Sequence, residues 1–159
     1  MKKRLAIFLS LIMVLSLMGC KGNGVKNAAK NFSDDFLIDI TLDVECEELV
    51  DTTDLSGKGD TSYVFTLSKD RVKKIVDVIE NSWGDTEHDE ELLKLVYEEK
   101  WEDGKTIAKS GKIPKLEYEG YWYAKTAKGR GKTIEKNKDL TLAIIDVINC
   151  KIYYFVRKV

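Results

Sequence analysis

The residues with the most recognisable chemistry lie in a basic stretch, "AKGRGKT", that ends in Gly131, Lys132 and Thr133. Nucleotide-binding phosphate loops have the pattern GxxxxGK followed by Ser or Thr, because the first glycine makes the turn that points backbone N–H groups at the phosphates. Thr126 occupies the position of that glycine. The residues that follow also lack the apolar stripe of the helix that such a loop requires. We therefore expect no nucleotide site in this stretch.

The same stretch is a candidate for contact with anions. Its candidate contact residues are Lys125, Lys128, Arg130 and Lys132, and Glu135 is the only acid near them. A cationic loop beside a membrane can meet phospholipid head groups or teichoic acids. The alternative is a solvated connection between two antiparallel strands, which is the commoner role of a charged loop.

A candidate aromatic platform consists of Tyr121, Tyr123 and Tyr153. Tyr121 and Tyr123 alternate with Trp122, and we expect Tyr153 on their side of a sheet. An exposed aromatic row can stack on sugar rings or receive a partner protein. The alternative is packing beneath a helix, since aromatic residues are common in sheets.

Catalytic and metal-binding patterns are absent from the sequence. The one histidine, His88, lies in an acidic stretch, and a hydrolytic triad needs a base within hydrogen-bond reach of a Ser or Cys nucleophile. The segment "DTEHDEE" lacks the glycine that a calcium loop needs at its sixth position, and Val96 replaces its bidentate glutamate. One histidine and two cysteines, Cys46 and Cys150, are few for a zinc site. We expect no catalytic residue, no metal and no cofactor.

The first nineteen residues have the order of a secretory signal peptide. Lys2, Lys3 and Arg4 precede an apolar run from Leu5 to Met18. This run is shorter than the roughly 20 residues that span a hydrocarbon core. It ends in Leu17-Met18-Gly19-Cys20, which resembles the lipobox of bacterial lipoprotein precursors. The alternative is a conventional signal peptide with a cysteine near its end.

The resemblance implies that the chain is cleaved between Gly19 and Cys20. It also implies that Cys20 is acylated, for example with palmitate, and that the acyl chains anchor the protein to the extracytoplasmic face of the cell membrane. Two acyl chains are sufficient for a stable anchor. Cleavage removes three of the 26 basic residues and none of the 27 acidic ones, which leaves a net charge near −4. Neither nucleic acid nor a nucleotide is therefore an expected partner. The lysine-rich composition with one proline is typical of a low-GC Gram-positive bacterium.

The two remaining cysteines, Cys46 and Cys150, have two interpretations. Outside the cytosol an even number of cysteines permits a Cys46–Cys150 disulfide. The alternative is a pair of free cysteines that pack as small apolar residues.

The elements expected after the signal peptide form one α+β domain. We expect residues 20–33 to form the lipidated cysteine and a flexible tether, and residues 34–159 to form the domain. Strict alternation predicts a strand over residues 36–46 that pairs with a second strand around residues 63–67. Ser68 begins a helix that Gly84 ends, and "HDEELLKLVYEEKW" favours another.

The C-terminal third predicts three further strands, with a hairpin turn at "VINC". Its "EGYWY" and "LAIIDVINCKIYYF" segments resemble a region of small uncharacterised exported lipoproteins of Gram-positive bacteria, which implies a fold more than an activity. The expected fold class is α+β, with an antiparallel sheet of about five strands packed by one or two helices.

The expected function is that of a non-enzymatic binding or interaction module at the cell envelope. Its partner would be an envelope protein or an anionic wall polymer. The alternatives are a small envelope enzyme that uses acidic residues and an immunity-type lipoprotein that protects its producer from an exported toxin.

Overall fold

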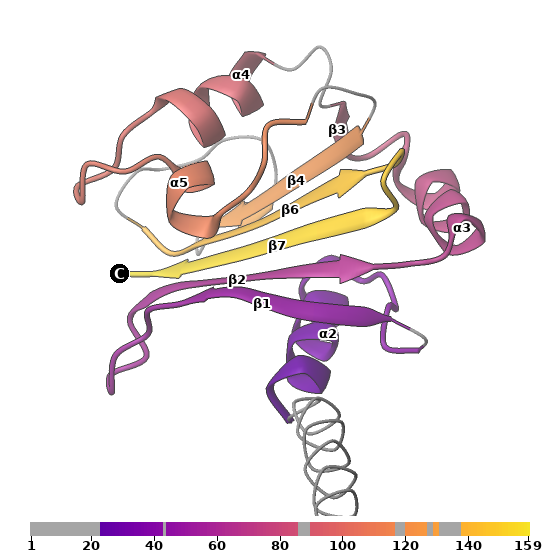
Figure 1. The fold of residues 1–159 in the computed structure, drawn as a ribbon. Helices are drawn as coiled ribbons and strands as arrows, with labels where there is room; N and C mark the ends of the chain where they lie inside the picture. Colours follow the sequence, from indigo (N-terminus) through magenta and orange to yellow (C-terminus); the bar gives the residue numbers. More distant parts are fainter. Residues whose placement is uncertain (1–22, 43, 86–89, 117–119, 127–128, 131–137) are drawn as a thin grey trace, which may run out of the picture. The chain divides into compact units, whose positions relative to one another are not determined.

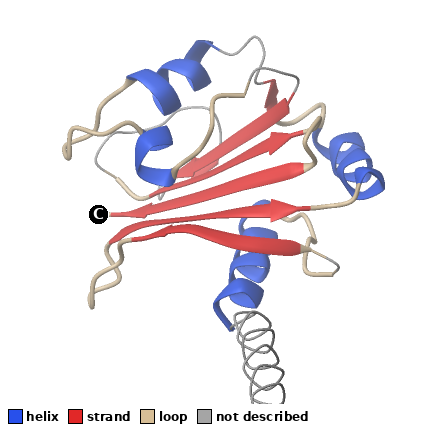
Figure 2. Cartoon of the chain, in the orientation of Figure 1, coloured by secondary structure: helices blue, strands red, loops and turns tan. Residues whose placement is uncertain are grey.

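The computed structural model describes residues 23–159 except 43, 86–89, 117–119, 127–128 and 131–137. The chain divides into two compact units, residues 1–41 and residues 42–159. The fold is α+β, as predicted, with five antiparallel strands of seven or eight residues (Figure 2). None of the helices in the described part of the chain has the length and hydropathy of a membrane-spanning segment.

The first unit contains helix α2, Asn23–Phe36. The expectation of a flexible tether is wrong for residues 23–33, which are helical. Ala28, Ala29 and Phe32 recur at helical spacing, and small alanines make this stripe difficult to recognise in the sequence. The helix ends at Leu37, which has a φ of 60° and donates its N–H to Ser33 O at 2.8 Å.

The second unit begins with an antiparallel hairpin of β1, Glu45–Asp51, and β2, Gly59–Thr66. The hairpin is confirmed, but the predicted strand over residues 36–46 is wrong because helix α2 continues to Phe36 and β1 starts only at Glu45. Strand β1 is an edge strand of the sheet that the described residues form, and its side chains Glu45, Glu47 and Glu48 are exposed. Charges on an edge strand oppose the addition of further strands.

The strand order of the sheet is β1-β2-β7-β6-β4-β3, and the two-residue β5, Gly129–Arg130, pairs with β4. All pairs are antiparallel. The last three long strands are β4, Gly120–Thr126, β6, Leu140–Asp146, and β7, Lys151–Lys158. Strand β7 therefore lies in the middle of the sheet, and the predicted turn at residues 147–150 joins it to β6.

Helix α3, Lys69–Ile79, follows β2 and begins at the predicted N-cap. The Ser68 Oγ accepts a hydrogen bond from the Arg71 N–H at 3.4 Å. Its apolar stripe of Val72, Ile75 and Ile79 is buried. The short strand β3, Gly84–Asp85, comes next and pairs with β4.

One face of the sheet is covered by the segment between β3 and β4 (Figure 1). This segment contains α4, Glu90–Leu93, the π-helical turn η1, Lys94–Glu98, and α5, Ile107–Gly111. The second predicted helix is confirmed as α4 and η1, whereas α5 was not predicted. The core between this segment and the sheet includes Leu92, Val96, Trp101, Ile107, Trp122, Leu142, Ile144 and Phe155.

Candidate functional site

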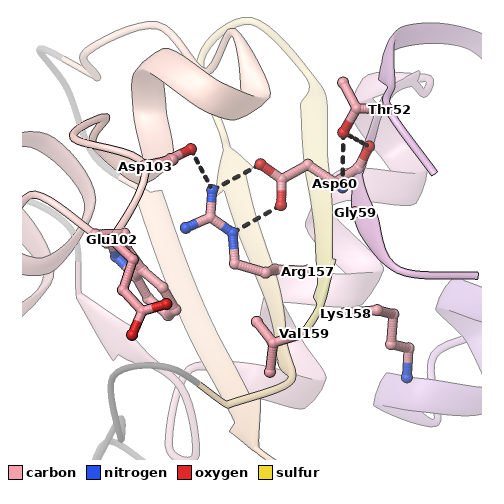
Figure 3. A pocket seen from close by; sticks show the side chains of 9 residues that line it. Thr52, Gly59, Asp60, Glu102, Asp103, Arg157, Lys158 and Val159 are labelled. Atoms are coloured by element: carbon pink, nitrogen blue, oxygen red, sulfur yellow. Dashed lines mark hydrogen bonds and ion pairs between the residues drawn. The ribbon is translucent and has the colours of Figure 1, made fainter. Parts of the chain in front are cut away.

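A buried ion pair between two neighbouring strands forms the centre of the candidate site. Asp60 of β2 and Arg157 of β7 are direct register partners, and their side chains are 13% and 7% exposed. Arg157 Nε donates to Asp60 Oδ1 at 2.7 Å, and Nη2 donates to Asp60 Oδ2 at 2.6 Å (Figure 3). This is the bidentate geometry that guanidinium and carboxylate groups favour. Burial lowers the pKa of Arg157, but the hydrogen bond and charge of Asp60, with the charge of Asp103, raise it, so Arg157 is cationic.

The loop of the β1–β2 hairpin fixes the position of Asp60. Thr52 Oγ1 accepts a hydrogen bond from the Asp60 N–H at 2.9 Å (Figure 3). The Thr52 backbone N–H donates to Asp60 O at 2.9 Å. Gly59 has a φ of 133°, and a Cβ there would lie 2.5 Å from Thr52 O. Only glycine permits this approach of the two backbone segments.

A turn and helix α5 hold Arg157 from the other side. The guanidinium carbon of Arg157 lies 4.6 Å from the centroid of the Trp101 ring, which is a cation–π distance. Arg157 Nη2 also donates to Ser110 Oγ at 3.0 Å and lies 3.5 Å from Asp103 Oδ2. The turn is closed by the Trp101 N–H, which donates to Lys105 O at 3.0 Å.

Asp60, Trp101, Asp103 and Arg157 line a cavity of about 270 Å³. Arg157 Nη1 makes no hydrogen bond with any described residue (Figure 3). Trp101 Nε1 is also buried without a hydrogen-bond partner in the described part of the chain. Glu102 is exposed in the lining of the cavity. The cavity therefore combines carboxylates with a guanidinium donor that no described residue engages.

Two of the carboxylates in this cavity, those of Asp60 and Asp103, are engaged by Arg157. Both oxygens of Asp60 accept hydrogen bonds from Arg157, and Asp103 lies against the same guanidinium. Glu102 is the only side-chain carboxylate in the lining that makes no ion pair with a described residue. A glycosidase-type acid–base mechanism requires two carboxyl groups that flank the reacting bond.

The structure separates the three tyrosines of the predicted aromatic platform. Tyr153 pairs with Ile144, which pairs with Trp122, so Tyr153 lies on the face of Trp122. Tyr121 and Tyr123 lie on the opposite face, and the prediction that the three share one face is wrong. The Tyr123 ring packs against Trp83, with the ring centroids 5.7 Å apart.

The predicted cationic loop lies largely outside the described residues. Lys128 and Lys132 belong to the residues that are not described, and of Arg130 only the backbone in β5 is described. Lys125 lies in β4 and is half-buried. Gly19, Cys20 and His88 are also outside the described residues. Among those that are described, no group of three or more His, Cys, Asp or Glu side chains could hold a metal ion.

Cys46 and Cys150 are free, and the Cys46–Cys150 disulfide is not formed. Cys46 lies in β1, whereas Cys150 precedes β7, and β2 lies between these strands. Two strand spacings amount to about 9.6 Å, which is more than the roughly 7 Å that a disulfide can span between Cα atoms. Burial, with a smaller effect from the charge of Glu48, raises the pKa of Cys46 to about 12.

The residues that form the cavity were not identified from the sequence. Asp60 and Arg157 are 97 positions apart, and neither lies in a recognisable motif. The one available signal is Arg157 within the apolar strand "KIYYFVRK", where a buried cation requires a partner. Comparisons with protein-family models, curated proteins and solved structures find no match for the chain.

Proposed function

We propose that this protein is a lipid-anchored extracytoplasmic binding module whose Arg157 cavity receives a polypeptide segment of a cell-envelope protein. The observation that supports this proposal is Nη1 of Arg157, which has no hydrogen-bond partner among the described residues. Asp60 and Ser110 hold the guanidinium in place while this donor remains available. A donor that is fixed before binding loses little conformational entropy when a ligand arrives.

The charges of the cavity favour a polypeptide over an anionic wall polymer. Asp60, Glu102 and Asp103 outnumber Arg157 and Lys158 in its lining, and Lys158 Nζ lies 3.5 Å from the Asp139 carboxylate. A polyanion would be repelled by this excess of carboxylates. A backbone carbonyl can accept from Arg157 Nη1 while a neighbouring basic side chain lies near the acidic rim. A toxin-protective lipoprotein is one form of this function, in which the bound polypeptide is the exported toxin.

The lipid anchor is supported by the lipobox and is tested by replacing its cysteine. We expect Cys20→Ser to leave the protein unprocessed or to release it from membranes, because only a thiol accepts the lipid. Cys46→Ser is the matched control and should retain processing and membrane attachment. Fractionation with immunoblotting measures both. Normal cleavage and membrane retention of the Cys20→Ser protein would contradict the anchor.

The binding cavity is tested by photo-crosslinking in intact cells. A photoreactive phenylalanine replaces Thr53, which is exposed and adjacent to Thr52 of the cavity, and Lys74 on α3 is the control position. We expect one discrete adduct with an envelope protein from position 53 only. Arg157→Lys keeps the positive charge beside Asp60 but removes the paired donors, and should lower the yield about tenfold. Equal adducts from both positions, or a yield that Arg157→Lys leaves unchanged, would contradict the proposal.

A further inference from the structure

We propose that a second cavity, at the opposite end of β7, binds a phosphate group. The cavity has a volume of about 330 Å³, and its lining includes Lys115, Asp146, Asn149, Lys151 and Tyr153. It lies on the same face of the sheet as the Arg157 cavity, because side chains two positions apart along a strand share a face. Lys151 and Arg157 are six residues apart in β7, which corresponds to about 20 Å.

The hydroxyl of Tyr153 is the first element of this site. Tyr153 is 7% exposed, and its hydroxyl makes no hydrogen bond with any described residue. The neighbouring Tyr97 differs, since its hydroxyl donates to Pro114 O at 2.7 Å. Tyr153 lines the cavity, where a phosphate oxygen would accept a hydrogen bond from its hydroxyl. Burial and the charge of Asp146 raise the pKa of Tyr153, which keeps this hydroxyl a donor at neutral pH.

Two lysines supply the positive charge. Lys115 is exposed and Lys151 is half-buried, and neither forms an ion pair with a described residue. Asp146 is the register partner of Lys151. Its carboxylate accepts hydrogen bonds from the Asn149 N–H at 2.9 Å and from Asn149 Nδ2 at 2.8 Å. These hydrogen bonds direct the Asp146 carboxylate toward Asn149. The ammonium groups of Lys115 and Lys151 and the hydroxyl of Tyr153 therefore remain available to a ligand.

A phosphate group matches this set of donors. It offers several acceptor oxygens, and hydrogen bonds from ammonium groups to phosphate are stronger than neutral ones. The positive excess of this cavity contrasts with the acidic excess around Arg157. The phosphate could belong to free phosphate, to a polyol phosphate or to a lipid head group, which share this chemistry.

The test is an NMR titration of the full-length protein with sodium phosphate at constant ionic strength. We expect saturable shifts of the backbone amides of Asn149, Lys151 and Tyr153. Tyr153→Phe removes the hydroxyl but keeps the ring, and it should weaken phosphate binding about tenfold. Lys151→Gln should weaken binding similarly, whereas Lys74→Gln on α3 should change the affinity less than about twofold. Thermal melting of each variant verifies that it is folded.

The source of the phosphate is assigned by two further probes. Tighter binding of glycerol 3-phosphate than of inorganic phosphate indicates a polyol phosphate. Tighter binding of phosphatidylglycerol vesicles than of phosphatidylcholine vesicles indicates a lipid head group. Either result supports the site if the substitution Tyr153→Phe weakens the binding of that probe. A response that sodium chloride reproduces, or a phosphate affinity that Tyr153→Phe leaves unchanged, would overturn the proposal.

Discussion

Tyr153 and Arg157 project from the same face of β7, and the fully buried Phe155 lies between them in the strand. Each residue lines its own cavity, so one strand positions both candidate sites. The apolar core between the cavities keeps their charged groups apart. Substitutions in the two sites should therefore act independently.

This independence is measurable as additivity of free energies of unfolding. We expect the loss of stability in the double variant Asp60→Ala, Tyr153→Phe to equal the sum of the two single losses within about 0.5 kcal/mol. Urea denaturation of the four proteins gives the values. A coupling above about 1 kcal/mol would show that the two ends of β7 are energetically linked.

Removing one partner of the buried ion pair should destabilise the protein strongly. Asp60→Ala leaves the guanidinium of Arg157 without its bidentate acceptor, and the expected cost is about 3–5 kcal/mol. Asp139→Ala is the control, because the pair of Asp139 and Lys158 is exposed and should contribute less than about 1 kcal/mol. Urea denaturation distinguishes these values. Equal effects of the two substitutions would contradict the structural role of Arg157.

Gly111 is required for the packing of α5 on the sheet. An added Cβ would lie 2.8 Å from Cδ2 of the Phe155 ring, and Gly111 O accepts a hydrogen bond from Ser62 Oγ at 2.8 Å. We expect Gly111→Ala to lower stability by about 1–3 kcal/mol through overpacking. Gly24→Ala, whose added Cβ would meet no described atom within 4 Å beyond its chain neighbours and its own helix backbone, should not destabilise the protein. Thermal unfolding of the two variants compares them.

Stability should fall with rising pH above about pH 10. Burial raises the pKa of Tyr97 from its ordinary value of 10 to about 12. The unfolded chain then loses this proton near pH 10 while the folded protein still holds it. The contribution of Tyr97 is complete below pH 10 and is lost as the pH rises to about 12.

The matched variant is Tyr97→Phe, and urea denaturation between pH 8 and pH 12 measures the effect. Its stability should fall less steeply above pH 10, although the lost hydrogen bond to Pro114 O lowers it by about 1 kcal/mol at pH 8. An identical slope in both proteins would show that Tyr97 ionises normally in the folded state.

The Cys46 thiol should react slowly in the folded protein. Only the thiolate attacks disulfide reagents, and a pKa of about 12 leaves little thiolate at pH 8. The double variant Cys20→Ser, Cys150→Ala leaves Cys46 as the single thiol. We expect Ellman's reagent to label Cys46 at least about a hundredfold more slowly in the folded protein than in the urea-unfolded protein. Similar rates in both conditions would mean that Cys46 is accessible and normally acidic.

Elements with local signals were predictable from the sequence. Helix α3 has a side-chain cap in Ser68 and an apolar stripe at helical spacing, and the β6–β7 hairpin connects two adjacent apolar strands. The end of α2 has no such signal, because Leu37 adopts a positive φ that is unusual for leucine. Alternating apolar residues beyond that point were therefore misread as a strand.

The candidate sites depend on register, which local patterns do not reveal. Residues 142–145 in β6 and 152–155 in β7 are buried on both faces of the sheet, so their hydrophobicity does not show which side each residue occupies. This is why Tyr153 was placed with Tyr121 and Tyr123 instead of with Trp122. Asp60 and Arg157 become neighbours only when β7 pairs with β2.

The middle position of β7 has a consequence for biogenesis. Among the described strands, β7 alone pairs with both the β1–β2 hairpin and the β4–β6 pair, and it is the last of these strands to be synthesised. Until residues 151–158 emerge, each half has an open edge and lacks the partner that completes it. The complete sheet therefore cannot form on a nascent chain that lacks these residues. A polypeptide that stays incomplete until late in translation would suit the export that we propose for this protein.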